Sequence, residues 1–309
     1  MPDDSAYTSE VNSWWAKNGR QNADCFVLPH TREEVATALT TLANESVSGG
    51  NSSIAVRSGG HNSIGFSSTA NGITIDLSLL NVTAYNAETN IASIGPGGKW
   101  QYVYKELVKY GITVTGGRDG DVGVGGFLLG GGNSYYSGRQ GWGCDGVINF
   151  EVVLANGTII NANEVENADL WQALKGGGNN FGIVTQFDME AVQAPPLFSD
   201  TRFLSQNYSY AMIDAAVGFA DSDESLADDH FFTFFSHNTG ASPDIYSIGV
   251  HVNTQGITNN TTPFDDARSL PAFLNITIVE DIATAAANSH VSSGTWYVIP
   301  IPRLGRLIG

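Results

Sequence analysis

Glycines gathered beside a histidine are the residues of this sequence with the most direct chemical meaning. His61 follows two glycines in the run Arg57-Ser58-Gly59-Gly60-His61-Asn62, which comes after a short apolar segment that predicts a strand. Successive backbone N–H groups in a glycine-containing turn point inward and bind an anion such as a pyrophosphate. The simpler interpretation is an ordinary Gly-Gly turn, and this run alone favours the simpler one.

A second glycine-rich segment, Asp121 to Gly132, excludes several common kinds of site. Gly123 and Gly125 begin a G-x-G pattern, but Leu128 stands where a dinucleotide-binding fingerprint needs its third glycine. The sequence has no G-x-x-x-x-G-K-[ST] phosphate loop, no G-x-S-x-G turn and no H-E-x-x-H or C-x-x-C spacing. A Rossmann domain, a P-loop nucleotidase, a hydrolase of that kind and a metal site of these kinds are therefore unsupported.

A third segment of this kind points to a specific family. It reads Gly178-Asn179-Asn180-Phe181-Gly182-Ile183-Val184-Thr185, and glycine-rich loops between strands suit a large, flat ligand that carries phosphates. Together the three segments resemble the FAD-linked oxidases of the vanillyl-alcohol oxidase and p-cresol methylhydroxylase (PCMH) superfamily. Within it they are most similar to the fungal type of the berberine-bridge-enzyme-like branch. The resemblance extends over about residues 22–194.

The resemblance implies roles for three residues. His61 takes the place of the histidine that bonds covalently to FAD. Asp119 stands where many relatives carry a cysteine that forms a second bond, and aspartate cannot form that thioether, so we expect a single attachment. Val122 matches the position that controls access of oxygen to the flavin, and valine there is associated with O2 as electron acceptor.

The resemblance also implies a larger set of FAD-binding residues and leaves the catalytic base unassigned. Relatives usually take that base and their substrate contacts from a later segment that nothing here matches. We expect FAD to be held by Arg57, Ser58, Gly59, Gly60, His61, Asn62, Val122, Gly123, Gly125, Gly126, Gly131, Ile183 and Val184. The two cysteines form either one bridge or two buried thiols, and we expect Cys144 to be a structural thiol.

The elements that must position these residues read as an α+β chain with two domains. We expect a PCMH-type FAD-binding domain of two α/β subdomains over residues 22–194, with Pro195-Pro196 as a natural boundary. An incomplete substrate domain with an antiparallel sheet follows over residues 195–309. The clearest local signals are a capping box, a helix end and a hairpin turn, given respectively by Thr31 with Glu34, Gly111, and Asn156-Gly157.

Regular elements are expected on both sides of that boundary. Apart from the segments named above, the pattern predicts strands near 25–28, 54–56, 73–77, 91–94, 147–154, 158–160, 181–189, 231–235 and 246–252, and helices near 32–44, 100–110, 169–175 and 211–220.

Charge and composition restrict the partners. The formal net charge is −17, which disfavours nucleic acid and anionic membranes, and no apolar stretch is long enough to span a bilayer. No signal peptide is visible, yet N-x-[ST] sequons are dense, so we expect a secreted, glycosylated monomer whose N-terminus is missing. The sequons are at Asn44, Asn51, Asn81, Asn156, Asn207, Asn259, Asn260 and Asn275.

The sequence therefore predicts an FAD-dependent oxidase that transfers hydride from a small organic substrate to flavin, with O2 as acceptor. The substrate could be a carbohydrate, an alcohol or a secondary metabolite. The main alternative is a truncated, inactive flavin-binding fragment, because relatives are longer and residues 296–309 do not continue the family pattern. A third interpretation is a carbohydrate-binding β-rich module, which would need exposed aromatic residues on one sheet face and would bind no flavin.

Several aromatic residues and histidines have no role assigned by these motifs. Trp14, Trp15 and Trp142 are expected to pack rather than to bind sugars. The histidines at positions 230, 237 and 251 are expected not to be catalytic, with contact to the substrate by any one of them as the alternative.

Overall fold

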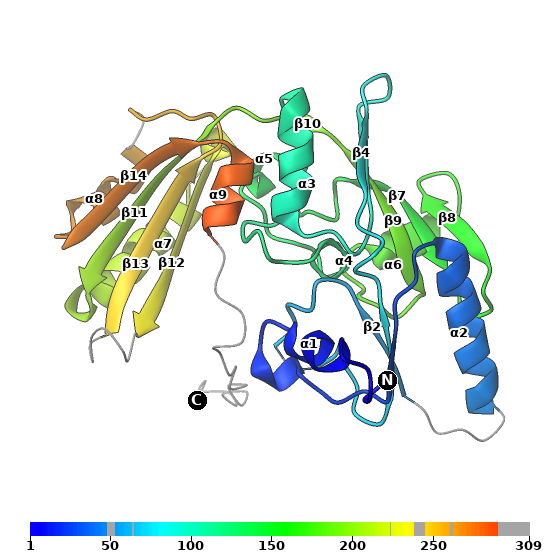
Figure 1. Cartoon of the computed structure of the whole chain (residues 1–309). Coiled ribbons are helices and arrows are strands. Elements are labelled where there is room, and N and C mark those ends of the chain that lie inside the picture. The colour runs from blue at the N-terminus through cyan, green and yellow to red at the C-terminus, as the bar shows by residue number, and fades with distance from the viewer. Residues whose placement is uncertain (48–52, 64, 223, 238–244, 260–261, 290–309) are drawn as a thin grey trace, which may run out of the picture.

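The computed structural model describes residues 1–47, 53–63, 65–222, 224–237, 245–259 and 262–289. The sequons at Asn51 and Asn260 and the expectation for residues 296–309 lie outside the described residues. The described chain forms four sheets with helices packed on them (Figure 1), which confirms the predicted α+β fold class.

A small parallel sheet carries the first glycine loop at the end of one of its strands. Its order is β1-β3-β2, and the helix α2 runs between β1 and β2. Helix α2 buries Val35 against Ile75 and Leu77, so the sheet and helix share one apolar cluster. The predicted cap is confirmed, because the backbone N–H of Glu34 donates to Thr31 Oγ1 at 3.2 Å. The elements are β1 Cys25–Val27, α2 Arg32–Val47, β2 Ser53–Arg57 and β3 Gly72–Asp76.

The second sheet has five antiparallel strands. Its order is β4-β5-β9-β7-β8, and the predicted hairpin joins β7 to β8 with Gly157 at φ +82°. Phe150 of β7 and Phe187 of β9 are fully buried and contact each other edge to face. The strands are β4 Thr83–Asn86, β5 Ile91–Ile94, β7 Val147–Val153, β8 Ile159–Asn163 and β9 Ile183–Glu190.

Helices and a short two-stranded ladder complete this part of the molecule. Helix α3 and the turn η2 end at Gly111, whose φ of +70° is the left-handed cap that the sequence predicts. Strands β6 and β10 pair antiparallel. The elements are α3 Trp100–Leu107, η2 Val108–Tyr110, β6 Ile112–Thr113, α4 Val124–Leu129, α5 Ser137–Gln140, α6 Ala168–Leu174 and β10 Val192–Gln193, and before them α1 Tyr7–Asn12 and η1 Lys17–Gly19.

The fourth sheet is antiparallel, in the order β12-β13-β11-β14, with helices on one face (Figure 1). Met212 of α7 and Ala267 of α8 pack with Leu204 of β11. The elements are β11 Leu197–Ser205, η3 Gln206–Tyr208, α7 Ser209–Ala220, η4 Glu224–Leu226, β12 Asp229–His237, β13 Ile245–Asn253, η5 Thr262–Phe264, α8 Asp265–Ser269, β14 Leu274–Glu280 and α9 Ile282–Asn288.

The last described helix joins this sheet to the rest of the molecule. Ile282 and Ala286 of α9 belong to the same buried cluster as the five-stranded sheet, and so does Val252 of β13. The backbone N–H of Gly120 donates to the carbonyl of Ala286 at 3.0 Å. Helix α9 therefore supports the loop that leads into α4.

The structure also settles three smaller points. The sequence-based expectation lacks strands β4, β6, β10, β11 and β14 and helices α1, α4, α5, α8 and α9. Cys25 and Cys144 are both free thiols, the first half-buried and the second buried. Within the described ranges, no helix combines the length and apolarity that a bilayer crossing requires.

Candidate cofactor site

The three glycine-rich segments come together around one cavity of about 910 Å³. It lies between the parallel sheet and the five-stranded sheet. Its volume is within the usual range for cofactor sites. We call it the cofactor cavity. Of the predicted FAD-binding residues, its lining includes Ser58, Gly59, Gly60, His61, Asn62, Val122, Gly123, Gly125, Gly126, Ile183 and Val184.

Two of the glycine loops touch each other through their backbones. A Cβ placed on Gly59 would lie 2.5 Å from Gly123 Cα, and one placed on Gly123 would lie 2.3 Å from Gly59 N. Ser58 holds the loops together, since its Oγ donates to the carbonyl of Pro96 at 2.6 Å and accepts from the N–H of Gly125 at 3.1 Å. Any side chain at Gly59 or Gly123 would force these loops apart.

Arg57 lies beneath the first loop, outside the cavity lining. Its Nη1 donates to Asp76 Oδ2 at 2.8 Å and also pairs with Glu10 of α1. The guanidinium lies 3.9 Å from the ring centroid of Trp14, and Gly60 at φ +67° leaves room for it. Arg57 therefore fixes the loop to β3 and to the N-terminal helix.

His61 sits at one end of the cavity in an ordered environment. Its ring stacks on Trp15 with centroids 4.6 Å apart and planes 15° apart, and the N–H of Trp15 donates to the carbonyl of Gly60. Its Nε2 lies 3.8 Å from Asp119 Oδ2 and has no hydrogen-bond partner among the described residues. Burial lowers the pKa of His61 and outweighs the charge of Asp119, so the imidazole is neutral at neutral pH.

The turn that carries Asp119 and Val122 is held rigidly. The N–H of Asp121 donates to Asp119 Oδ1 at 2.8 Å, while Asp121 itself accepts from Lys99 Nζ and Gln101 Nε2. Val122 is half-buried and lines the cavity directly after this turn. The predicted oxygen-access position therefore faces the cavity.

The remaining predicted residues lie on the far wall or just outside it. Ile183 and Val184 line the cavity from the start of β9, after Gly182 at φ +151°. Gly131 lies outside the lining at φ +100°, and its carbonyl accepts from the N–H of Cys144 at 2.8 Å. Cys144 belongs to that loop contact, and burial raises the pKa of its thiol.

The structure brings a further cluster to the other side of Asp119, which sequence patterns did not indicate. Arg118 Nη1 lies 3.0 Å from Nε2 of His230 on β12, and Tyr135 meets the His230 ring edge to face. The guanidinium also lies 4.8 Å from the ring centroid of Phe232. We call these four residues the Arg118 cluster. No local signal could have revealed it, because Arg118 and His230 are 112 residues apart.

His251, another histidine of the fourth sheet, lies away from the cofactor cavity and is not among its lining residues. His251 is buried among the helices of that sheet, stacked on Phe264 at 3.7 Å, with Nδ1 3.8 Å from Asp200. Burial lowers the pKa of His251 to about 3. The side chain of His237 lies outside the described residues.

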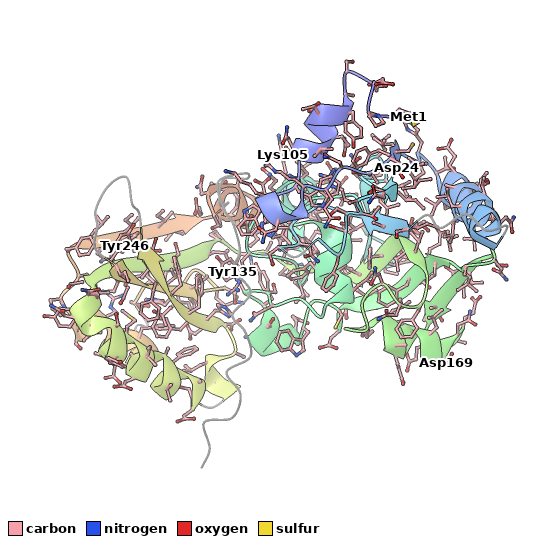
Figure 2. All side chains as sticks on the ribbon, turned by 90° about the horizontal axis from the view of Figure 1, so that it is seen from below. Met1, Asp24, Lys105, Tyr135, Asp169 and Tyr246 are labelled. Atoms are coloured by element: carbon pink, nitrogen blue, oxygen red, sulfur yellow. The ribbon has the colours of Figure 1, made fainter. Side chains whose placement is uncertain are left out.

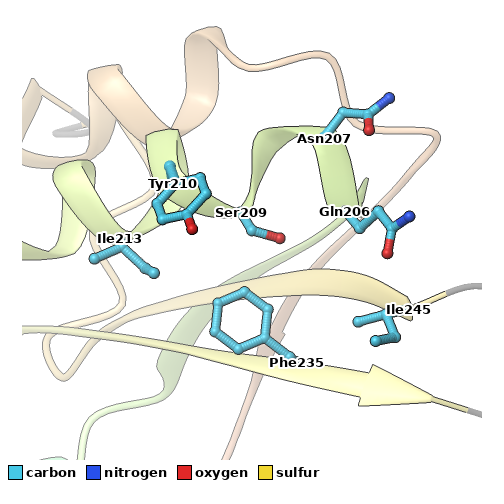
Figure 3. Close-up of a pocket in the computed structure, with 7 residues that line it drawn as sticks. All are labelled: Gln206, Asn207, Ser209, Tyr210, Ile213, Phe235 and Ile245. Atoms are coloured by element: carbon cyan, nitrogen blue, oxygen red, sulfur yellow. The ribbon is translucent and has the colours of Figure 1, made fainter.

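A second hollow of about 540 Å³ lies at the end of the fourth sheet (Figure 3). Its described lining has no charged side chain and comprises Gln206, Asn207, Ser209, Tyr210, Ile213, Phe235 and Ile245. It offers no group suited to redox or acid–base chemistry. Among the described residues there is also no group of His, Cys, Asp and Glu that could hold a metal ion.

Comparisons with known proteins identify FAD-binding relatives. Residues 23–163 match the FAD binding domain family. The FAD-dependent monooxygenase drtC of Aspergillus calidoustus is 34% identical over 97% of this chain and 65% of its own length. The FAD-dependent monooxygenase sdcF of Emericella nidulans is 42% identical over 62% of this chain and 40% of its own length.

Solved structures show the same fold. The 6-hydroxy-D-nicotine oxidase of Arthrobacter nicotinovorans matches 93% of this chain and 62% of its own with a TM-score of 0.79 at 23% identity. Berberine bridge enzyme in complex with (S)-reticuline matches 92% of this chain and 58% of its own with a TM-score of 0.75 at 21% identity. The chain thus spans at most about two thirds of the length of each of these four proteins.

Proposed function

We propose that the chain, a member of the FAD-linked flavoproteins of the vanillyl-alcohol oxidase and p-cresol methylhydroxylase superfamily, oxidises a small organic substrate with O2 as the acceptor. Bound FAD would supply the redox chemistry, by accepting hydride from the substrate and passing electrons to oxygen. The observation that carries this proposal is the cofactor cavity, whose walls are the three glycine-rich segments and whose end is His61.

The residues present fit FAD on two structural grounds. Gly59 and Gly123 approach so closely that backbone groups line the cavity at this point, which suits a pyrophosphate. His61 Nε2 is buried without a hydrogen-bond partner among the described residues. We propose that Ser58–Asn62 and Val122–Gly126 hold the cofactor from one side and Ile183–Val184 from the other.

We further propose that His61 attaches the cofactor covalently, through one bond. The neutral imidazole is a nucleophile, and the stack on Trp15 fixes the plane of its ring. Nε2 of that ring is buried, has no hydrogen-bond partner among the described residues and lies 3.8 Å from Oδ2 of Asp119. Asp119 also occupies the position from which a cysteine would form a second bond, so the attachment remains single.

Val122 supports the proposal of O2 as acceptor. Its short branched side chain lines the cavity next to the turn that holds Asp119. We propose that it leaves a path for oxygen that a longer leucine would narrow. The products would then be the oxidised substrate and hydrogen peroxide.

Purified protein tests this proposal in two steps. Flavin absorbance should co-elute with the protein on gel filtration, and reducing substrates should bleach it without air and produce peroxide with air. Absence of flavin from protein that is folded and was expressed with ample riboflavin would contradict the proposal. The test applies to carbohydrates, alcohols and aromatic secondary metabolites in turn.

One observation favours a second candidate, flavin binding without turnover. Strand β14 is an edge strand whose residues are almost all exposed, including Leu274, Ile276 and Val279. An exposed apolar edge lowers the stability of a sheet and promotes association. Bound flavin that none of the tested substrates bleaches, but that a chemical reductant does bleach, would select this candidate.

We also propose that the protein is secreted and glycosylated. Every described sequon asparagine is exposed, as glycosylation requires: Asn44, Asn81, Asn156, Asn207, Asn259 and Asn275. A mobility shift on treatment with an endoglycosidase would support this proposal, and a single unshifted species from a secreting eukaryotic host would contradict it.

A further inference from the structure

The Arg118 cluster lies where the loop that carries Asp119 meets the fourth sheet. Arg118 directly precedes Asp119, and Asp119 faces His61 at the end of the cofactor cavity. Figure 2 shows Tyr135 between the four-stranded sheet and the rest of the molecule. The cluster therefore adjoins the cofactor cavity at its His61 end, outside the cavity lining.

The strand register shows which face of the sheet the cluster uses. Phe231 points to the helices, where it contacts Phe219 and Phe264. Successive side chains of a strand alternate between faces, so His230 and Phe232 lie on the opposite face. That face meets the core that continues from the five-stranded sheet, as the packing of Phe232 against it shows.

The charge of Arg118 has no negative partner there. Within the described residues, no Asp or Glu oxygen lies within ion-pair distance of its guanidinium, whereas Arg57, Arg139 and Arg268 each pair with a carboxylate. Arg118 is half-buried, and a positive charge removed from water without a counter-charge is costly. A ligand that brings a negative oxygen would relieve that cost.

His230 holds the guanidinium in place rather than neutralising it. A guanidinium only donates hydrogen bonds, so Nε2 of His230 must accept and the ring proton must be on Nδ1. Burial, with the charge of Arg118, lowers the pKa of His230 to about 4, which keeps the ring neutral. Tyr135 packs edge to face against that ring with only 6% of its surface exposed.

Two aromatic rings lie next to the guanidinium. Phe232 and Phe234 lie on the same face of β12, with nearly parallel rings whose centroids are 6.2 Å apart. Phe234 is 43% exposed, so the two rings extend from the half-buried Arg118 out to solvent. A planar ring can lie along these two rings while an oxygen on it reaches Arg118.

We propose that Arg118 binds an acidic oxygen, a phenolic or enolic hydroxyl or a carboxylate, of a substrate built on a planar conjugated ring. The inference deepens the proposed function, on which it rests, by naming the substrate class. His230 and Tyr135 are positioning residues that orient Arg118. The local positive charge also explains how a chain of net charge −17 can bind an anion.

Binding of matched probes tests this proposal directly. The probes are 4-nitrophenol, its methyl ether 4-nitroanisole, and 4-nitrobenzoate, and the measurement is equilibrium dialysis with FAD-loaded protein above the pKa of the phenol. The parent should bind nitrophenolate or nitrobenzoate at least about tenfold more tightly than nitroanisole, as a charge-assisted hydrogen bond implies. The two anions distinguish a hydroxyl from a carboxylate as the recognised oxygen.

Three variants complete the experiment. R118Q should lose the preference for the anion, R118K should keep part of it, and the control R139Q, whose exposed guanidinium pairs with Asp228, should keep all of it. Equal binding of the three probes by the parent, or unchanged preference in R118Q, would overturn the proposal. If both Arg118 variants fail to fold, the parent remains informative, because its affinity for nitrophenol should fall as pH drops below the phenol pKa.

Flavin content keeps the two proposals separable. All variants should retain the flavin content of the parent, since Arg118 lies outside the lining of the cofactor cavity. A parent without flavin would contradict the proposed function, while the probe comparison on the same protein would still support or overturn the role of Arg118.

Discussion

The cofactor cavity and the Arg118 cluster are neighbours that the chain builds in different ways. In the cavity, the first two glycine-rich segments touch through their backbones at Gly59 and Gly123, and the hydroxyl of Ser58 fastens them together. The cluster consists of side chains from two distant segments that meet only when β12 packs against the loop of Arg118. The backbone contact of the cavity suits a cofactor, whose structure does not change. The side chains of the Arg118 cluster can vary with the substrate.

The largest effect is expected from a substitution that breaks the backbone contact between Gly59 and Gly123. In G59V the new side chain would collide with the backbone of Gly123, and we expect loss of bound flavin together with a destabilisation of about 1–3 kcal/mol. Flavin absorbance and thermal unfolding measure the two effects. The control is G218A in α7, where an added Cβ meets no atom within 4 Å. Full flavin binding by G59V would show that the loops are not the cofactor wall.

A smaller effect is expected where the cavity does rely on a side chain. W15A removes the ring that stacks on His61, an interaction worth about 0.5–1.5 kcal/mol. Covalent attachment should slow by about threefold to tenfold while noncovalent flavin is retained. Time courses of acid-stable flavin measure this rate. W142A, which removes an exposed tryptophan, is the control, and equal rates in W15A and the parent would remove Trp15 from the account.

Val122 provides a test confined to the oxygen step. V122L should lower the rate at which O2 reoxidises the reduced protein, because the longer side chain narrows the path for oxygen along this part of the cavity. The flavin content should stay unchanged. Stopped-flow reoxidation in air-saturated buffer gives the rate. V114L, at a fully buried core position, controls for a general packing defect. Reoxidation in V122L at the parent rate would argue against Val122 as the oxygen gate.

The smallest expected effect is on the pH dependence of stability, which should differ between the two regions. Near the cofactor cavity, burial and the neighbouring Asp76 raise the pKa of Glu10 to about 7, so the folded state keeps a proton that the unfolded chain releases. Stability should therefore fall as pH rises from about 4.5 to 7 on account of this group. E10Q should flatten that limb in unfolding curves, and an unchanged limb would mean that Glu10 titrates normally.

The fourth sheet should show the opposite slope. His230 and His251 have folded pKa values of about 4 and about 3, below the 6.5 of an unperturbed histidine. The unfolded chain takes up protons first, so stability is fully present above pH 6.5 and falls toward pH 4. H251Q should weaken this acid limb. A variant that keeps the full acid dependence would assign it to other groups.

The same contrast explains what the sequence could predict. The hairpin at Asn156-Gly157, the cap of Thr31 and the left-handed cap of Gly111 after η2 depend on local backbone preferences, and all three are confirmed. Helix α4 was missed because its glycines give no helical periodicity. It is short, and its start is fixed by distant contacts such as that of Ser58 with Gly125.

Some parts of the candidate site could also be predicted from local sequence, and others could not. The glycine loops could be predicted to meet because their residue types require close backbone approach, whereas Arg57 and Gly131 turn out to support the cavity from outside its lining. The Arg118 cluster depends on the strand order of the fourth sheet and on which face of β12 each residue occupies. Neither can be derived from local sequence.

The central claim is that His61 is the single point of attachment for FAD, and intact-protein mass spectrometry under denaturing conditions tests it most directly. The parent and the control H30A, which changes an exposed histidine, should each carry the mass of one FAD, and H61A should carry none. FAD that remains bonded in H61A, or a parent that binds flavin but releases all of it on denaturation, would contradict the account.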